Sequence, residues 1–163
     1  MDVDLRGPGW VHRDGAAARG RAFDGDDLLD ASAIADRFTC DADESDSESP
    51  AAAVAATASD LDGFYAAVVE DRTGAGADAA VLVADGARSI PLYYGVHNGS
   101  AVVSDRGRVV RDALDAPTDP VTESEFLVTR YVSGPETIWT GVRSTRASAV
   151  IRINDGGGFE STT

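Results

Sequence analysis

Residues 80–104 read AVLVADGARSIPLYYGVHNGSAVVS, and this stretch shows how the second half of the chain is organised. Two apolar runs, Ile90–Tyr94 and Ala101–Ser104, flank the polar tetrapeptide His97–Ser100. An Asn-Gly pair between two apolar runs strongly favours a two-residue hairpin turn. A further β-rich run, Ala80–Ala84, precedes them, so the pattern predicts antiparallel strands joined by tight turns.

The segments on either side add strands nearby and helices further out. Glycine-rich residues 71–78 separate the β-rich run Phe64–Glu70 from the run at Ala80, which predicts another hairpin or short loop. Apolar spacing, helix propensity and acidic first turns predict the helices, and short apolar runs predict the last strands. The expected helices are Arg21–Phe38, Pro50–Ser59 and Thr122–Tyr131, and Val109–Leu114 is expected to be a short amphipathic piece. The expected late strands are Trp139–Val142 and Ala149–Ile153. This order predicts an α+β fold with mainly antiparallel sheet.

The length of 163 residues fits a single domain that spans 1–163. Within it, the acid- and serine-rich run 41–49 is expected to be a disordered loop, and residues 155–163 a frayed tail. No window approaches 18 consecutive apolar residues. The acidic start, Met1-Asp2-Val3-Asp4, lacks the basic and apolar regions of a signal peptide, so a cytoplasmic protein is expected.

The charge of the chain is strongly negative, at −14, and all 14 of its basic residues are arginine. Such a surface repels phosphate backbones and anionic lipids, so neither nucleic acid nor a membrane is expected as a partner. Acidic surfaces keep halophilic proteins soluble, which favours a salt-adapted protein. An acidic mesophilic protein from a GC-rich genome is the alternative.

The sequence gives little support for a metal or cofactor site. The chain has one cysteine, Cys40, and its two histidines, His12 and His97, are far apart in sequence, so no metal site is expected. The segment Gly74–Ala79 superficially matches a dinucleotide fingerprint, but a β-rich run follows where that motif needs a helix. A hairpin explains it better, and no cofactor is expected.

A series of motifs in the second half carries a family resemblance. In order, they are LDGFYA at 61–66, VADGARSIPLYY at 83–94, VSD at 103–105 and YVSGPETIWTGVR at 131–143. The series resembles the N-terminal glutamine amidotransferase type-2 domain, an Ntn-type glutaminase, of the asparagine synthetase family. The matches keep their order and approximate spacing over residues 61–154. The resemblance implies a four-layer α-β-β-α sandwich, Ntn-hydrolase-like, with two mainly antiparallel sheets.

In that family, the resemblance implies, an N-terminal cysteine attacks the amide of glutamine, and its free amino group acts as the base. Asp2 follows Met1 here and lacks the thiolate that this reaction needs. Cys40 cannot replace it, because its nitrogen lies in a peptide bond. We therefore expect no catalytic residue.

The substrate-binding motifs of the family are also altered. Its Asn-Gly-Glu motif has its best-placed match in Arg19, Gly20 and Arg21, where two cations would repel the amine of glutamine. The segment Arg6–Gly9 resembles the family's Arg-Gly-Pro-Asp, with glycine in place of aspartate. Ser45–Glu48 is similar to its Ser-Asp-x-Glu, although chance explains that match better in so acidic a run. Arg19, Gly20 and Arg21 are the candidate, degenerate substrate-binding residues.

The resemblance thus predicts a domain related to asparagine biosynthesis that has lost its glutaminase activity. The chain also lacks the Ser-Gly-Gly-x-Asp-Ser loop with which the synthetase half binds ATP. We expect a structural or partner role toward an ATP-using synthetase domain or subunit. Two alternatives stay open: an active glutamine-hydrolysing enzyme with a misassigned start or unusual nucleophile, and a small module that binds an amino acid or an anion.

Overall fold

The computed structural model describes residues 1–44, 50–71, 79–154, 156 and 158–162. Its helices occur in two pairs between runs of strands, as in an α+β chain. In chain order they are β1 (Asp2–Asp4), β2 (Val11–Arg13), β3 (Ala16–Asp24), β4 (Asp27–Asp30), α1 (Ala31–Glu44), α2 (Pro50–Asp60), β5 (Leu61–Asp71), β6 (Ala79–Ala84), β7 (Tyr93–His97), β8 (Ser100–Ser104), α3 (Gly107–Leu114), α4 (Pro120–Thr129), β9 (Arg143–Ser144), β10 (Val150–Asn154) and β11 (Phe159–Thr162).

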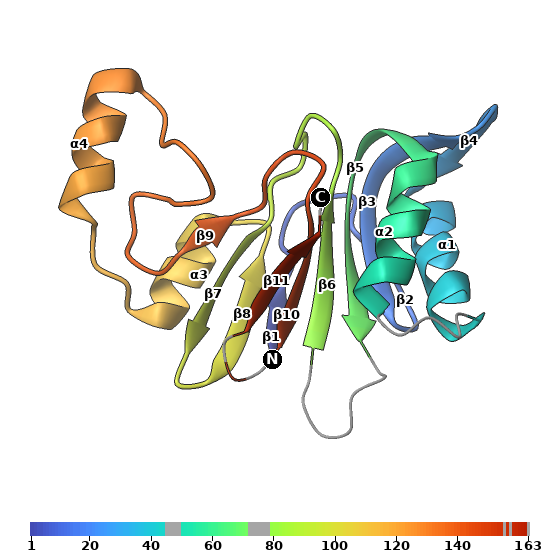
Figure 1. Ribbon diagram of the computed structural model, residues 1–163, viewed down its shortest axis with the longest axis horizontal. Helices are drawn as coiled ribbons and strands as arrows, with labels where there is room; N and C mark the ends of the chain where they lie inside the picture. Colours follow the sequence, from blue (N-terminus) through green and yellow to red (C-terminus); the bar gives the residue numbers. More distant parts are fainter. Residues whose placement is uncertain (45–49, 72–78, 155, 157, 163) are drawn as a thin grey trace.

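The strands form two sheets (Figure 1). The smaller sheet has the order β1-β8-β7-β9, and the larger has the order β11-β10-β6-β5-β3-β2, with β4 paired to β3. Among the described strands, only the β1–β8 pair is parallel. The prediction of an α+β chain with mainly antiparallel sheet is confirmed.

The hairpin predicted around Asn98-Gly99 joins β7 to β8. Both turn residues have positive φ, 51° for Asn98 and 80° for Gly99. A two-residue type I′ turn needs this conformation at both positions, and Asn-Gly adopts it at the lowest steric cost. The sequence signal and the backbone therefore agree.

The two sheets pack face to face through an apolar layer. The larger sheet contributes residues of β5, β6 and β10, such as Leu82 and Ile153, and the smaller sheet contributes Tyr94 and Val103. Many of the other side chains in this layer are alanine, including Ala66, Ala80 and Ala101. The inner faces of both sheets thus form one buried core.

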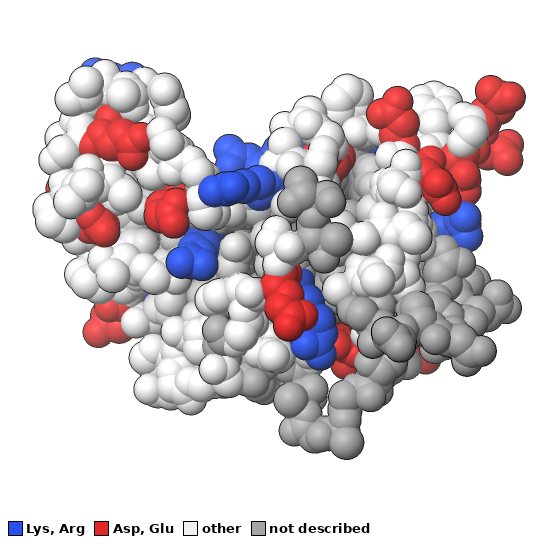
Figure 2. Space-filling view, viewed as in Figure 1, with Lys and Arg blue, Asp and Glu red and all other residues white. Residues whose placement is uncertain are grey.

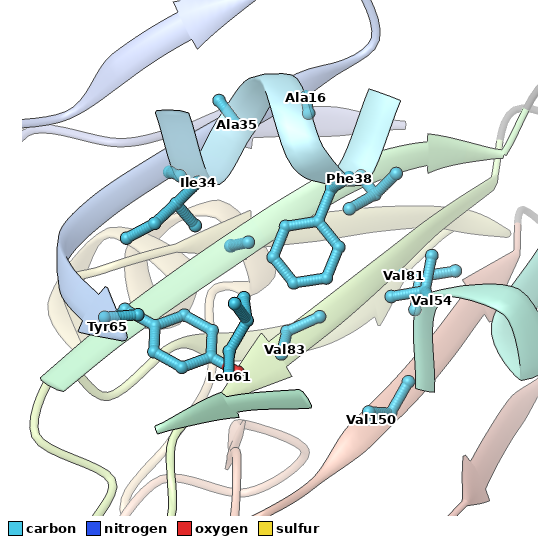
Figure 3. Packing of buried hydrophobic residues seen from close by; sticks show 14 of the residues in the cluster. Ala16, Ile34, Ala35, Phe38, Val54, Leu61, Tyr65, Val81, Val83 and Val150 are labelled. Carbon is cyan, nitrogen blue, oxygen red and sulfur yellow. The ribbon is translucent and has the colours of Figure 1, made fainter. Parts of the chain in front are cut away.

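Helices α1 and α2 cover the outer face of the larger sheet (Figure 1). Ile34 and Phe38 of α1 are fully buried against Tyr65 and Val83 of the sheet, with Val54 of α2 beside them (Figure 3). Fully burying such side chains contributes about 1.5–3 kcal/mol each. The residues between these helices and the larger sheet therefore form a second core, separate from the one between the two sheets.

Helix α3 covers the outer face of the smaller sheet. Val110 of α3 is fully buried and packs with Val102 and Val142, with Leu114 and Trp139 at the margin of the cluster. Helices therefore lie on the outer faces of both sheets. Helix α4 follows α3 but has no buried residue, and Figure 1 shows it standing away from the sheets.

Part of the predicted helix at Arg21–Phe38 is wrong. Residues 21–30 belong to the strands β3 and β4, and α1 begins only at Ala31. Asp30 marks this start, because its carboxylate accepts a hydrogen bond from the backbone N–H of Ala33 at 3.0 Å. A carboxylate at this position caps a helix N-terminus.

The ends of other elements also differ from prediction. Residues 41–44 extend α1 instead of belonging to the loop predicted at 41–49, and residues 45–49 lie outside the described residues. Phe159–Thr162 is not frayed, because it forms β11 and pairs with β10. The strand predicted at Trp139–Val142 is reduced to an isolated bridge from Trp139 to Thr118, and β9 follows it.

No helix in the described part of the chain combines the length and apolar character needed to cross a membrane.

Candidate functional site

The three degenerate substrate-binding positions, Arg19, Gly20 and Arg21, lie in succession on β3. Ala18 and Ala22 of the same strand pack into the helical-side core. Because side chains alternate along a strand, Gly20 faces the helices, and Arg19 and Arg21 face the side of the smaller sheet. The structure therefore brings the two arginines to one face.

Gly20 is required by the close approach of β3 to β5. Its φ is 111°, and a Cβ there would lie 2.0 Å from the carbonyl oxygen of Phe64. Gly63 of β5 faces the same restriction, because its Cβ would lie 2.4 Å from the carbonyl oxygen of Arg21. The obstacle is backbone in both cases, so no side-chain movement relieves it. The role of Gly20 is structural.

Arg19 belongs to a cluster around the carboxylate of Asp105, which follows β8. Asp105 accepts hydrogen bonds from the backbone N–H groups of Arg6 at 2.9 Å and Gly7 at 2.7 Å, and from Nε1 of Trp10 at 2.9 Å. The guanidinium Nη1 of Arg19 lies 3.6 Å from its Oδ2. Asp105 therefore ties the N-terminal segment and β3 to the end of the smaller sheet.

The electrostatics of Asp105 follow from these contacts. Its side chain is only 3% exposed, and burial alone would raise its pKa. The hydrogen bonds from Trp10 and from the N–H groups of Arg6 and Gly7, together with the charge of Arg19, outweigh burial and hold the pKa below its usual value. Asp105 is thus a satisfied carboxylate at neutral pH, and its oxygens are occupied by the fold.

Gly7 lies where this cluster leaves no room for a side chain. A Cβ at Gly7 would lie 2.3 Å from both Nη1 of Arg19 and Oδ2 of Asp105. The Arg-Gly pair at Arg6–Gly7, which resembles the family motif, is thereby placed against Arg19. The sequence motifs at 6–9, 19–21 and 103–105 therefore converge in space, although their contacts are internal.

Arg21 does not join this cluster. In the sheet register it lies opposite Phe64 of β5 and Asp30 of β4, and it is exposed. Phe64 is 68% exposed and Phe23 is 49% exposed, so this end of the inner face of the larger sheet is open. The two arginines therefore have different surroundings.

The remaining sequence candidates are scattered. Cys40 lies on α1, which packs on the opposite face of the larger sheet from β1 and the Asp105 cluster. His12 lies on β2 and His97 ends β7, and both are exposed. Residues 45–48 and most of Gly74–Ala79 lie outside the described residues, but a strand, β6, follows the latter segment. Among the described residues, no group of three His, Cys, Asp or Glu could hold a metal ion.

Asp105 and Trp10 are site residues that the sequence alone did not single out. Asp105 ends the Val103–Asp105 motif, which indicated a scaffold match. Their contact joins positions 95 residues apart. That motif was the available signal, but spacing could not reveal which segment the carboxylate would hold.

Helix α4 carries an exposed apolar surface, which we call the α4 surface. Val121 and Val128 lie two turns apart on the same side of the helix, Leu127 precedes Val128 in it, and Tyr131 follows its C-cap, Arg130. These four side chains are 75%, 83%, 62% and 62% exposed. Apolar surface that is contiguous and exposed marks an interaction site more often than an isolated apolar side chain does.

Helix α4 is nevertheless a well-formed helix. The side chain of Asp119 accepts hydrogen bonds from the backbone N–H groups of Val121 and Thr122, and Pro120 occupies the first turn. Arg130 adopts the left-handed conformation at its C-cap. Its caps therefore define the helix even though it buries no side chain.

The chain matches no protein-family model, and no curated protein is similar to it.

Proposed function

We propose that this protein is a degenerate glutamine amidotransferase type-2 domain, similar to the glutaminase half of asparagine synthetases, that binds a partner chain and does not hydrolyse glutamine. The observation that carries the proposal is the α4 surface. Burying its exposed valines, leucine and tyrosine against another molecule would remove apolar surface from water and so stabilise a complex. The partner is an ATP-using synthetase chain.

The architecture supports the family part of this proposal. Two stacked sheets with helices on both outer faces are compatible with the sandwich of the type-2 amidotransferases. The motifs at 6–9, 19–21 and 103–105 meet around Asp105, as parts of one ancestral site would. The N-terminal strand β1 lies in the smaller sheet beside β8.

The chemistry of the same region supports the loss of glutaminase activity. A glutaminase site of this class needs an asparagine side-chain N–H that donates to the oxyanion and a carboxylate that binds the amine of glutamine. Arginines occupy both positions, and Arg19 is engaged by Asp105. The only cysteine of the chain, Cys40, lies on a helix behind the larger sheet. No thiol of the described chain is therefore near the positions that would bind the substrate.

A glutaminase assay tests the loss of activity. Purified protein is incubated with glutamine in molar potassium chloride, and glutamate and ammonia release are measured. We expect no turnover above that of a protein-free blank. Glutamate release above the blank would overturn the proposal, and release that Cys40→Ser abolishes would identify Cys40 as an unusual nucleophile.

Co-elution with a synthetase chain tests the partner role. An ATP-using synthetase chain without its own glutaminase half is mixed with this protein and separated by size. We expect a complex that Leu127→Glu with Val128→Glu disrupts, because charge is then buried at the interface. Leu28→Glu is the matched control, since Leu28 is an equally apolar, 56% exposed residue on β4. Absence of a complex, or equal disruption by the control, would contradict the role of α4.

A further inference from the structure

One end of the inner face of the larger sheet is uncovered. Ala22, Leu29 and Leu61 pack on the helical side of this sheet. Because side chains alternate along a strand, their sequence neighbours on β3, β4 and β5 face the opposite side. These neighbours are Arg21, Phe23, Leu28, Asp30, Asp62 and Phe64, and all six are exposed. We call these six residues the sheet-end surface.

The strand register makes the residues of the sheet-end surface neighbours. Phe23 lies opposite Leu28 of β4 on one side and opposite Asp62 of β5 on the other, and Phe64 lies opposite Arg21. Opposite side chains have Cβ atoms about 5 Å apart, and diagonal neighbours such as Phe23 and Phe64 are about 7–8 Å apart. The two rings and the leucine therefore form one contiguous apolar area.

Exposed apolar side chains are concentrated here and on α4. Phe23, Leu28 and Phe64 are each about half exposed or more. Apart from α4 and the adjoining Tyr131, the described chain exposes only one other large apolar side chain, Val3. Contiguous exposed apolar surface marks an interaction site, whereas apolar side chains scattered singly need no explanation. The sheet-end surface is therefore a candidate docking site.

The charges in and around the sheet-end surface are mainly acidic. The carboxylates of this region belong to Asp24, Asp26, Asp27, Asp30, Asp60 and Asp62. Two arginines oppose them: Arg21 within the surface, and Arg37, which is paired with Asp24 at 3.2 Å. Arg19, the next inner-facing residue of β3, is balanced by Asp105. Figure 2 shows the acidic side chains gathered over β4.

This charge balance restricts the partner. Six carboxylates and two guanidinium groups leave an excess of four negative charges around the apolar area. A second copy of the chain carries the same excess and is repelled, whereas a partner with lysine or arginine around an apolar centre is attracted. The complementary partner is therefore basic at its margin and apolar at its centre.

The shape of the surface favours a helix as the covering element. The face of a sheet presents side chains and no free backbone groups, so a segment that lies on it must satisfy its own N–H and C=O groups. A helix does so internally. Three neighbouring strands span about 10 Å, and one helix with its side chains is about 10–12 Å wide. One helix can therefore cover this surface, as α3 covers the smaller sheet.

We propose that the sheet-end surface binds a basic amphipathic helix of a partner chain. Apolar side chains along one stripe of that helix pack on Phe23, Leu28 and Phe64, which removes apolar surface from water on both sides. Lysine and arginine residues beside the stripe pair with the carboxylates of Asp26 and Asp62. Because β4 and α4 lie at opposite ends of the molecule (Figure 1), this contact is separate from the one that we propose for α4.

Titration with two model peptides tests the site. The probe is a fluorescent peptide of leucine and lysine, about 18 residues or five turns long, with its leucines on one face of the helix. The control peptide has the same composition, but its leucines are spread around the helix. Anisotropy is measured at the lowest potassium chloride concentration at which circular dichroism shows the folded protein. We expect a Kd of roughly 10–100 μM for the probe and at least about tenfold weaker binding of the control. No binding of the probe, or equal binding of both peptides, would overturn the proposal.

Paired variants locate the bound probe. Phe23→Ser with Phe64→Ser removes the two rings of the sheet-end surface, and Phe126→Ser with Val128→Ser removes exposed apolar side chains from α4 without a change of charge. We expect the first variant to bind the probe at least about tenfold more weakly and the second to bind it normally. Equal weakening, or weakening by the α4 variant alone, would overturn the proposal. If the first variant does not fold, Phe64→Ser alone replaces it.

Charge variants test the acidic margin. Asp26→Asn with Asp62→Asn should weaken binding of the probe about three- to tenfold, because each removes one ion pair at the surface. Asp2→Asn with Glu160→Gln removes the same charge from exposed positions on β1 and β11 and should leave binding unchanged. Equal weakening by both would mean that only the overall charge attracts the peptide, and would overturn the site.

Light scattering of the protein alone tests the other possible occupant, a second copy of the chain. We expect a monomer at the salt concentration of the titration, because like charges surround the surface. A dimer that Phe23→Ser with Phe64→Ser dissociates would show that a second copy covers the sheet-end surface, and would overturn the proposal of a basic helix.

Discussion

Helices α1 and α4 both carry large apolar side chains, yet the chain uses them in opposite ways. Phe38 of α1 is fully buried, whereas Val128 of α4 is 83% exposed. The outer face of the larger sheet is sealed by α1 and α2, but α4 extends beyond α3 without a surface of its own to cover (Figure 1). The difference indicates that the first helical layer stabilises this chain, whereas α4 adds little to its core and is available to the partner that we propose.

Substitution of the buried aromatic residue gives the largest expected effect. Phe38→Ala should lower the free energy of unfolding by about 3–5 kcal/mol, because it removes a buried ring and leaves a cavity. Phe126→Ala on α4 is the matched control, since that ring is 40% exposed, and we expect its cost to be much smaller. Urea unfolding at constant salt measures both. Equal losses would show that α4 is as important to stability as α1.

The change in the free energy of unfolding at alkaline pH tests how completely the α1–α2 layer buries Tyr65. Burial, with the nearby charges of Asp85 and Asp62, raises the pKa of Tyr65 to about 12. The unfolded chain loses this proton near pH 10 and the folded chain only near 12, so stability should fall by roughly 2–3 kcal/mol between those values. Below pH 10 the full contribution is present.

Two phenylalanine variants isolate this effect. Tyr65→Phe should flatten the loss of stability between pH 10 and pH 12, although it removes the hydrogen bond from the hydroxyl to the carbonyl oxygen of Ala58. Tyr131→Phe beside α4 should leave the loss unchanged, because that side chain is 62% exposed. Urea unfolding across the pH range measures both. A loss that persists in Tyr65→Phe would contradict the assignment.

Polar substitution of the α4 surface gives the smallest expected effect on the isolated protein. Leu127→Ser with Val128→Ser should change the free energy of unfolding by less than about 0.5 kcal/mol, as surface substitutions usually do. Val81→Ser with Val83→Ser is the control, because both of these valines are fully buried in β6. A large loss from the α4 substitutions would mean that α4 packs within its own chain.

Local signals in the sequence predicted much of the fold. The Asn98-Gly99 turn, α2 after Pro50, and β5 with β6 all have strong short-range patterns, and the structure confirms them. The predicted helix at 21–30 was wrong, because Ala22 and Leu29 pack on the same core at a spacing that also suits a helix. The strand conformation of Ala22 depends on pairing with β5, some 40 residues away, and that of Leu29 depends on pairing with Ala22.

The contacts of the candidate site could not be predicted from the sequence for the same physical reason, which is that they join residues far apart in the chain. Arg19, Gly20 and Arg21 were found by their order, but the different surroundings of the two arginines depend on Asp105 and Gly7. The contact of Asp105 with Arg6 spans 99 positions. Arg88 likewise donates to Ser144 and Thr145, 56 and 57 positions away, and no short motif predicts these contacts.

Gly20 and Gly63 should identify related sequences more reliably than amino-acid composition does. Valine, isoleucine and leucine can replace one another in a core over time, whereas these two glycines face main-chain atoms that no neighbouring substitution can move aside. Distant homologues that have diverged everywhere else should therefore still carry glycine at both places. An evolutionary search anchored on this pair, some forty positions apart, would reach further back than one anchored on the apolar core.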